Sequence, residues 1–245
     1  MDLTIVGCSG SFPGPDSAAS CYLFQAEGFR LLVDLGNGAL GALQRYADPG
    51  GIHAVCLSHL HTDHCIDMCS YNVFRIHNPS GLLPKIPVYG PAATAERLDR
   101  AAVDASRPIS DAFDFVTLAP GKIEIGPFAV RTARMSHPVE TFGFRLEHGG
   151  RSIAYSADTG PTGELIKLAQ DADVLLCEAS FTDGPGLPAD LHLTGRQAAE
   201  HATRAGAGRL VLTHLVPWNS RDQAQAEAAG GFAGDITLAV PGLVL

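Results

Sequence analysis

The sequence has little positive charge and no cluster of it. Its 245 residues include 17 lysines and arginines against 26 aspartates and glutamates, which gives a net charge of −9 at pH 7. The basic residues are scattered, with no cluster beyond pairs. A long polyanion is bound through clustered lysines and arginines that neutralise its phosphates, so this composition argues against nucleic acid as the main partner. A small phosphate ester stays compatible, because bound metal ions can reverse the local field.

Long apolar segments are absent as well, and so is a leader-like N-terminus. No stretch approaches the ~18 apolar residues that a membrane span requires, and residues 1–7 are typical of a first strand instead of a signal peptide. The six cysteines have no framework spacing. Reduced thiols and a cytoplasmic location are therefore expected, with no membrane partner. Hydrophobic residues make up 46% of the chain, which is enough for a large core.

Apolar strands and amphipathic helices alternate along the chain. The strand-like runs are residues 2–7, 21–25, 30–34, 53–58, 86–89, 128–134, 141–146, 151–156, 173–178, 209–214 and 236–240. Helical periodicity covers residues 38–47, 91–104, 161–171, 194–206 and 220–229, with Thr194 as a candidate N-cap. Hairpin-rich blocks at 1–34 and 116–156 are joined by segments that alternate strand and helix, which predicts two mixed sheets packed face to face with helices outside. No repeat or linker divides the chain, so we expect residues 1–245 to form a single domain.

The most informative motif is residues 58–64, SHLHTDH, directly after an apolar run. Three imidazoles and one carboxylate fall within six residues, too few for a complete metal site but enough for half of two adjacent ones. His59 and His61 would project the same way from a strand end, while Asp63 and His64 can face a second ion. Nitrogen and carboxylate oxygen suit zinc and related divalent ions. A polar turn that binds no metal is the alternative.

The remaining ligands must come from other strand ends. His137, Asp158 and His214 each follow directly on an apolar strand. Ligands at the ends of neighbouring strands converge on one edge of a sandwich, where irregular backbone can fold around ions. Each of the three taken alone is an ordinary strand-end polar residue. All three in this order after the 58–64 motif are a much stronger signal of a metal site.

This ordered set resembles the metallo-β-lactamase superfamily along almost the whole chain. Shorter motifs resemble its ribonuclease Z branch and, within that branch, the atypical class II cyclic-nucleotide phosphodiesterases of actinobacteria. The branch motifs are ADTG at 157–160, CEASF at 177–181, HLT at 192–194 and LTH at 212–214, and the narrower ones are GCSGS at 7–11, GALQR at 41–45 and LVPW at 215–218. The resemblance implies an α/β fold, the αββα four-layer sandwich of two mixed sheets flanked by helices.

The resemblance also implies two divalent metal ions, zinc first, with manganese or iron compatible with the same ligands. The first ion would be bound by His59, His61 and His137, the second by Asp63, His64 and His214, and both by Asp158. A hydroxide activated by the metal pair would attack the phosphodiester. Asp63 would also orient the attacking water.

A proton donor is implied by the branch resemblance. His192 would be the general acid for the leaving alkoxide, and Glu178 would hold its tautomer and support the imidazolium. Spacing alone favours a strand-end charge for Glu178 and a helix-start residue for His192. With the branch motifs matched at both positions, we expect a catalytic pair. The resemblance implies that this pair distinguishes phosphodiester hydrolases from the branches of the superfamily that hydrolyse lactams and thioesters, which lack it.

Four further residues are candidates for the surroundings of the site. Asp34 is expected to brace the metal-binding loop, although an aspartate that ends a strand before a glycine turn would look the same. Ser9 and Ser11 belong to a loop that can line the pocket, and turn chemistry explains them equally well. Trp218, the only tryptophan, can stack on a base or pack at an interface.

The sequence therefore favours a phosphodiesterase for small phosphodiesters, foremost cyclic nucleotides of the cyclic AMP type. Transfer-RNA processing members of the branch carry a long arm before the bridging aspartate, whereas residues 138–157 fit only two strands and a turn. The alternatives are a ribonuclease Z-like tRNA 3′-processing endonuclease or exonuclease, and a non-catalytic metal-dependent nucleotide-binding protein. Relatives of this branch often dimerise, so the resemblance also implies a homodimer.

Overall fold

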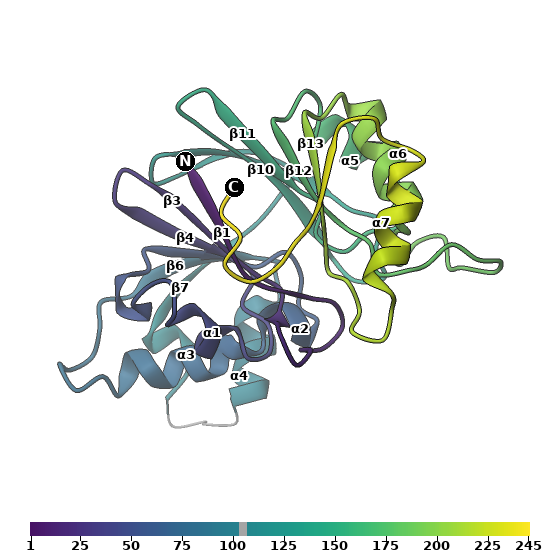
Figure 1. The fold of residues 1–245 in the computed structure, drawn as a ribbon. Coiled ribbons are helices and arrows are strands. Elements are labelled where there is room, and N and C mark those ends of the chain that lie inside the picture. The colour runs from purple at the N-terminus through teal and green to yellow at the C-terminus, as the bar shows by residue number, and fades with distance from the viewer. Residues whose placement is uncertain (103–106) are drawn as a thin grey trace.

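The computed structural model describes residues 1–102 and 107–245. Within these ranges, two seven-stranded mixed sheets face each other and helices cover both outer faces (Figure 1). The first sheet, in the order β2-β1-β3-β4-β5-β6-β7, contains β1 (Asp2–Ser9), β2 (Ala18–Ala19), β3 (Cys21–Ala26), β4 (Phe29–Val33), β5 (Ala54–Cys56), β6 (Ile86–Gly90) and β7 (Phe113–Thr117). The second, in the order β14-β13-β12-β11-β10-β9-β8, contains β8 (Gly121–Ile125), β9 (Phe128–Arg134), β10 (Phe142–His148), β11 (Arg151–Tyr155), β12 (Val174–Glu178), β13 (Arg209–Thr213) and β14 (Asp235–Leu238).

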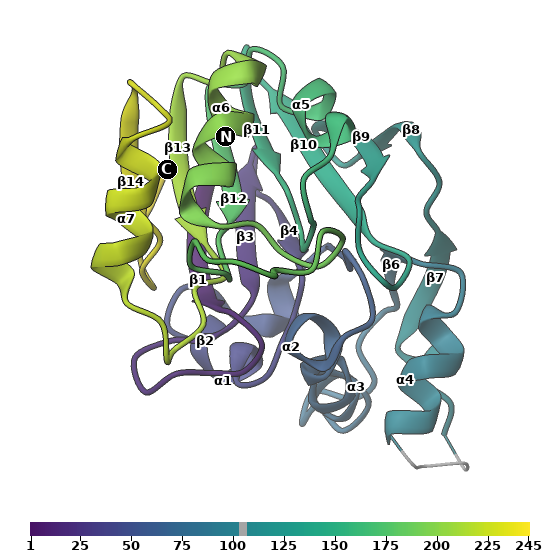
Figure 2. The same cartoon turned by 90° about the vertical axis from the view of Figure 1, so that its right-hand side faces the viewer.

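The helices form two groups on opposite sides of the strands, as both views show (Figure 1, Figure 2). The group beside the first sheet is α1 (Ala39–Leu43), α2 (Thr62–Cys65), α3 (Asp67–Ile76) and α4 (Thr94–Ala102). The group beside the second sheet is α5 (Gly163–Leu168), α6 (Gly195–Ala205) and α7 (Arg221–Ala229). Single 3₁₀ turns lie at Pro49–Gly51 and Ile109–Asp111.

Each sheet begins with antiparallel strands and continues with parallel ones. Strands β1, β3 and β4 pair antiparallel, and so do β8 to β11. Strands β4 to β7 and β11 to β14 are parallel. Helices connect most of these later strands, because a parallel pair needs a crossover connection. This arrangement accounts for the two hairpin-rich blocks that the sequence shows.

The main core lies between the two sheets. Leu3 and Phe24 of the first sheet belong to one apolar cluster with Phe144 and Leu146 of the second. Two further clusters lie between each sheet and its own helices. Burial of these apolar faces on both sides of each sheet is the main favourable term in folding. The layers are therefore helix, sheet, sheet and helix, and the predicted four-layer sandwich is confirmed.

The carboxyl ends of several strands meet at one edge of the sandwich. Strands β4 and β5 are parallel, so Asp34 and the 58–64 motif leave the first sheet at the same edge. In the second sheet β11, β12 and β13 are parallel, and β9 runs in their direction because both β9 and β11 are antiparallel to β10. The side chains at these ends are His137, Asp158, Glu178 and His214.

The predicted strands are present, with ends shifted by one or two residues. Strands β2, β7 and β8 were not predicted. Strand β2 has only two residues, and β7 and β8 are edge strands with largely exposed residues and a weak apolar pattern. The helix expected at 38–47 is confined to Ala39–Leu43, after Gly38 in the left-handed region and with Gly41 in its interior. The helix expected at 91–104 begins at Thr94, and residues 103 and 104 lie outside the described residues.

Helix α3 was also missed, because its buried face is partly polar. Arg75 is 1% exposed, and its guanidinium donates to the hydroxyl of Tyr71 and to the carbonyl of Pro84. The guanidinium carbon also lies 5.4 Å from the centre of the Tyr71 ring and 5.8 Å from that of Phe113. A buried arginine at a core position interrupts the apolar spacing by which a helix is recognised.

Several smaller predictions can be compared with the structure. Thr194 caps α6 in a capping box with Gln197, as expected. All six cysteines are free thiols. None of the helices within residues 1–102 and 107–245 is long and apolar enough to cross a membrane. Residues 142–155 form the predicted hairpin, which closes through Gly149 and Gly150 with φ of 60° and 79°.

The close approach at Gly36 yields a stability prediction. A Cβ atom there would collide with the carbonyl oxygen of Asp63 and lie 2.9 Å from the Cβ of Ala19. Gly36→Ala should therefore lower the free energy of unfolding by about 1–3 kcal/mol, as measured by urea denaturation. The control is Gly41→Ala, where no heavy atom lies within 4 Å of the new Cβ and the helix should gain about 0.5–1 kcal/mol. Equal stability of the two variants would show that the Gly36 contact is unimportant.

Candidate metal centre and proton donor

Two groups of ligand-type side chains meet at the edge of the sandwich and share one carboxylate. In each group the nearest nitrogen or oxygen atoms lie within 4.8 Å of one another. The first group is His59, His61, His137 and Asp158, and the second is Asp63, His64, Asp158 and His214. The structure thus brings together all seven predicted metal ligands.

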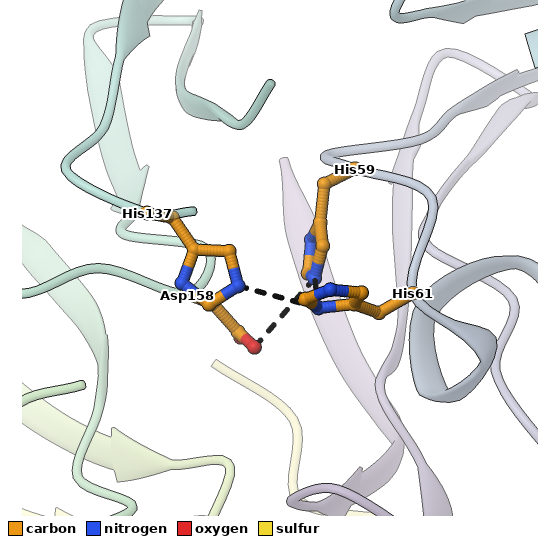
Figure 3. A group of neighbouring side chains, drawn as sticks. All are labelled: His59, His61, His137 and Asp158. Atoms are coloured by element: carbon orange, nitrogen blue, oxygen red, sulfur yellow. Dashed lines mark hydrogen bonds and ion pairs between the residues drawn. The ribbon is translucent and has the colours of Figure 1, made fainter. Parts of the chain in front are cut away.

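The first group combines both halves of the molecule (Figure 3). His59 and His61 lie in the loop between β5 and α2, and His137 follows β9. The Nδ1 atom of His61 is 3.0 Å from Nε2 of His59 and 3.3 Å from Nε2 of His137. The carboxylate of Asp158 is 3.7 Å from Nε2 of His59. Three ring nitrogens and one oxygen therefore point at a common centre.

The second group is more deeply buried. His64, from α2, and His214, after β13, bring their Nε2 atoms to 3.1 Å from each other. The carboxylate of Asp63 is 3.1 Å from Nε2 of His214, and that of Asp158 is 3.2 Å from Nε2 of His64. His64 and His214 are at most 1% exposed, whereas Asp63 reaches the surface of the cavity described below.

In four of the imidazoles, Nδ1 contacts a polar neighbour outside the donor groups. The Nε2 atom of the same ring therefore faces the other donors. The Nδ1 atom of His137 donates to the carbonyl of Leu191 at 2.9 Å. That of His214 lies 2.7 Å from the hydroxyl of Ser180. The corresponding atoms of His59 and His64 are held by Ser58 and Asp34, respectively. Partners of this kind fix the tautomer and orientation of metal-binding histidines.

Asp34 occupies the bracing position that the sequence suggested. Its Oδ2 atom lies 2.8 Å from Nδ1 of His64 and also accepts the hydroxyls of Ser58 at 2.8 Å and Tyr155 at 3.0 Å. Its Oδ1 atom accepts the main-chain amide of Ser58 at 2.7 Å. The carboxylate is fully buried, so these donors replace the water that it loses.

Three strand ends at this edge have left-handed backbone at residues other than glycine. The φ angles are 62° at Asp34, 52° at Ala157 and 55° at His214. Such conformations cost on the order of 1–3 kcal/mol each and gather where a site over-determines the backbone. Here each one turns the chain sharply after a strand, which directs Asp34, Asp158 and His214 into the site.

The charge balance of the cluster suits bound cations. Burial lowers the pKa of His59, His61 and His137, so these rings are neutral, which is the form that binds metal. Burial also disfavours charge on His64, but the carboxylates of Asp158 and Asp34 outweigh it and raise its pKa well above the usual range. The same carboxylates would favour a divalent cation here, with His64 as its neutral ligand in place of the proton.

Asp158 provides a direct test of whether a metal fits. Its carboxylate is 2% exposed, and its Oδ1 atom makes no well-aligned hydrogen bond within the described part of the chain, although Nε2 of His64 lies 3.2 Å and Nε2 of His214 lies 3.4 Å away. A buried carboxylate oxygen without a well-aligned donor is costly. A cation shared by the two groups would satisfy this oxygen, so the residues present fit a pair of divalent metal ions.

Next to the cluster, the partly exposed ring of His192 pairs with the buried carboxylate of Glu178. Nδ1 of His192 donates to Oε1 of Glu178 at 2.9 Å. That carboxylate is fully buried and accepts the main-chain amides of Thr159 at 2.7 Å and Ser180 at 3.1 Å. Burial lowers the pKa of His192, but the Glu178 carboxylate outweighs it and raises the pKa to about 9. The ring is therefore protonated at neutral pH.

A cavity of about 670 Å³ opens onto these groups. Its wall includes Asp63, Asp158 and His192 together with the apolar side chains of Leu60 and Val139. Volumes of ~300–1,000 Å³ are usual for small-molecule sites. The cavity thus joins the metal donors and the protonated imidazole in one space of small-molecule size.

The remaining candidates lie in different places. Ser11 lines the cavity. Ser9 does not line the cavity. Its hydroxyl accepts the amide of Gly14 and donates to the carbonyl of Ser17, as expected for a serine that stabilises a turn. Trp218 is also outside the cavity wall. It is 74% exposed, and its ring centre lies 4.7 Å from that of Phe12.

Sequence reasoning missed the residues that orient the ligands. Ser58 and Ser180 lie within two of the recognised motifs, but the sequence assigned neither of them a role. Tyr155 reaches Asp34 from the other sheet, and Arg97 and Glu140 line the cavity from segments with no recognised motif. Contacts between sheets cannot be inferred from spacing within one strand.

The position of Asp34 predicts an effect on metal affinity. Asp34→Asn keeps the shape but removes the charge that supports His64, so the affinity for zinc should fall by about 10–100-fold. Isothermal titration or competition with a chelator measures this. Asp173→Asn is the matched control, because Asp173 accepts the amide and hydroxyl of Ser152 far from the cluster. If Asp34→Asn left the zinc affinity unchanged, Asp34 would not support the metal site.

Comparison with known proteins places these observations in a family. Residues 29–215 match the family described as Beta-lactamase superfamily domain. An uncharacterized protein of Mycobacterium tuberculosis is 44% identical over 240 residues, covering 96% of this chain and 88% of that protein. Ribonuclease Z of Mycolicibacterium gilvum is 34% identical over 245 residues, covering 89% of this chain and 85% of that protein.

One relative is similar in both sequence and structure. The probable metallo-hydrolase YhfI of Bacillus subtilis is 32% identical over 250 residues, covering 100% of this chain and 99% of that protein. Its crystal structure superposes with a TM-score of 0.89 at 29% identity and covers 100% of this chain and 98% of that one. With the family match and the donor cluster, the chain belongs to the beta-lactamase superfamily, as a metallo-hydrolase of its ribonuclease Z-like branch.

Proposed function

We propose that the chain is a dinuclear metal-dependent phosphodiesterase that hydrolyses small phosphodiesters, with cyclic nucleotides as the leading substrate class. The observation that carries this proposal is the His192–Glu178 pair beside two donor groups that share Asp158. A phosphodiester leaves as an alkoxide that needs a proton. The pair supplies that proton on the side of the cavity where the metal donors converge.

The two donor groups would each hold one divalent cation, with Asp158 common to both. The nitrogen and oxygen donors suit zinc, and also manganese or iron. Bound there, the cations would provide a hydroxide nucleophile at neutral pH and neutralise charge on the phosphodiester.

Asp63 has a second task besides holding metal. Burial raises its pKa, but hydrogen bonds with His214 and His64 outweigh burial and hold the pKa well below its usual range. The group is therefore a carboxylate at any cellular pH, and it faces the cavity. A carboxylate in that position can accept a hydrogen bond from the attacking water and orient it toward the phosphorus.

His192 is suited to donate a proton to the leaving alkoxide. Its Nδ1 atom is committed to Glu178, so Nε2 carries the proton that can be delivered into the cavity. Glu178 cannot turn away, because main-chain amides hold both of its oxygens. The carboxylate fixes the ring and stabilises the imidazolium, as in other histidine–carboxylate pairs.

The shape around the site favours a small substrate. The span between His137 and Asp158 is taken up by β10, β11 and a two-residue turn, with no inserted arm. The cavity of about 670 Å³ can contain a mononucleotide, and the net charge of −9 gives no general attraction for a polyanion.

The second candidate is a ribonuclease Z-like tRNA 3′-processing endonuclease or exonuclease. The 34% identity to a protein named ribonuclease Z supports it. A non-catalytic metal-dependent nucleotide-binding protein is the third, and the proton-donating pair speaks against it, because binding alone does not need a general acid.

The first test concerns metal-dependent hydrolysis. Protein loaded with zinc or manganese should hydrolyse bis(p-nitrophenyl) phosphate. His64→Ala should lower kcat/KM at least about a hundredfold, because even supporting partners of metal ligands are worth 10–100-fold in affinity or activity. His77→Ala, an exposed histidine at the end of α3, is the matched control. Full activity in His64→Ala would refute the mechanism, and faster cleavage of a precursor tRNA than of cyclic AMP would favour the second candidate.

The second test concerns proton donation. His192→Ala should slow cyclic AMP hydrolysis by about 10²–10⁴-fold but should affect bis(p-nitrophenyl) phosphate much less, because p-nitrophenolate leaves without a proton. Glu178→Gln should move the alkaline limb of cyclic AMP hydrolysis to lower pH. The reason is that Glu178 raises the pKa of His192 to about 9, so the imidazolium persists to higher pH when the carboxylate is present. Equal losses on both substrates would exclude a general acid.

A further inference from the structure

One wall of the cavity carries a cation to which the proposed mechanism gives no role. Arg97 is the only lysine or arginine among the described residues that line the cavity. It belongs to α4, whose preceding residues Pro91 and Ala93 line the same wall. The metal donors and His192 line the rest. The cavity thus has a guanidinium in addition to the positions that would bind and protonate the scissile phosphate.

Arg97 lies close to the metal-binding motif. Thr62 and Asp63, at the start of α2, line the same cavity as Arg97, and so does His61 just before them. A ligand that reached from the metal donors across the cavity would meet this guanidinium.

The same wall already contacts a carboxylate. The amide of Ala92, two residues before α4, donates to Glu140 at 3.3 Å, and Glu140 is also held by Arg134. Arg97 itself forms none of the ion pairs found within residues 1–102 and 107–245, in contrast to Arg100 on the next turn, which pairs with Glu96. The negative charge of Glu140 is thus balanced by Arg134 and the Ala92 amide, and it does not draw Arg97 into an ion pair.

We propose that Arg97 binds a second phosphate of the substrate, one that is not attacked. This inference rests on the proposed phosphodiesterase function and adds to the cyclic nucleotides a further substrate class, small phosphodiesters that carry another phosphate group, such as a 5′-phosphorylated dinucleotide. A guanidinium matches phosphate with two parallel charge-assisted hydrogen bonds, which are about twice as strong as neutral ones. A neutral base or sugar would use this group less well.

The experiment compares two substrates with the same scissile bond. The dinucleotide ApA contains one phosphodiester, and pApA contains the same phosphodiester and a 5′-terminal phosphate. For the metal-loaded protein, we expect KM for pApA to be about ten- to a hundredfold lower than for ApA, the range of a bond to a charged group. Equal KM values for the two substrates would overturn the proposal.

Variants of α4 assign the difference to Arg97. Arg97→Ala should raise KM for pApA about tenfold or more and remove the preference over ApA. Arg97→Lys should retain part of the preference, because the charge remains and the bidentate geometry is lost. Arg100→Ala is the control, since Arg100 is on the same helix but outside the cavity wall, and it should keep the full preference. If Arg97→Ala raised KM equally for ApA and pApA, the residue would contact the base or sugar and the second-phosphate proposal would fail.

The result is separable from the proposed function itself. If the metal-loaded wild type hydrolyses neither dinucleotide nor cyclic AMP, the phosphodiesterase proposal fails. Binding of pApA and ApA by isothermal titration then still reports on Arg97. Tighter binding of pApA that is lost in Arg97→Ala would support the phosphate site without turnover, and identical binding of the two would refute it.

Discussion

The carboxylate of Asp34 joins the two sheets beneath the metal donors. It ends β4 of the first sheet, yet it accepts the hydroxyl of Tyr155 from the second sheet and supports the ring of His64. A buried carboxylate is stable only when several donors reach it together, because the loss of hydration costs several kcal/mol. The strand ends, the 58–64 motif and the packing of the sheets must therefore form as one unit. The orientation of the metal-binding histidines is a consequence of that packing.

The site that results has distinct regions in one cavity. The two donor groups lie on one side of it, where Asp34, two serine hydroxyls and a main-chain carbonyl hold four of the imidazoles in place. His192 stands beside them with a protonated ring, because a second buried carboxylate, that of Glu178, raises its pKa. Buried carboxylates thus perform two tasks at this edge: Asp34 holds the ring of His64, and Glu178 stabilises the charge of His192. Both are held by hydrogen bonds from main-chain or side-chain donors of neighbouring strands.

The sequence was sufficient to predict most of the strands, the four layers and the seven residues that gather in the two donor groups, because the donor motifs come after apolar runs and because the order of motifs resembles a known superfamily. Helix α3 escaped prediction because Arg75 interrupts its apolar face. The supports of the ligands escaped for another reason. Tyr155 and Asp34 are 121 positions apart in the chain, and nothing in either segment indicates that the two will meet. Ser9 and Trp218 are close in sequence to Ser11 and His214, respectively, but neither of them lines the cavity.

Each metal group draws its donors from both sheets. His59 and His61 come from the first sheet and His137 from the second, and the same division separates His64 from His214. Metal ions bound there would act as cross-links between the halves of the sandwich. A ligand that binds only the folded state adds stability in proportion to the logarithm of its concentration. The supply of metal would then govern the lifetime of the folded protein as well as its activity, and a cell short of metal would lose the protein itself.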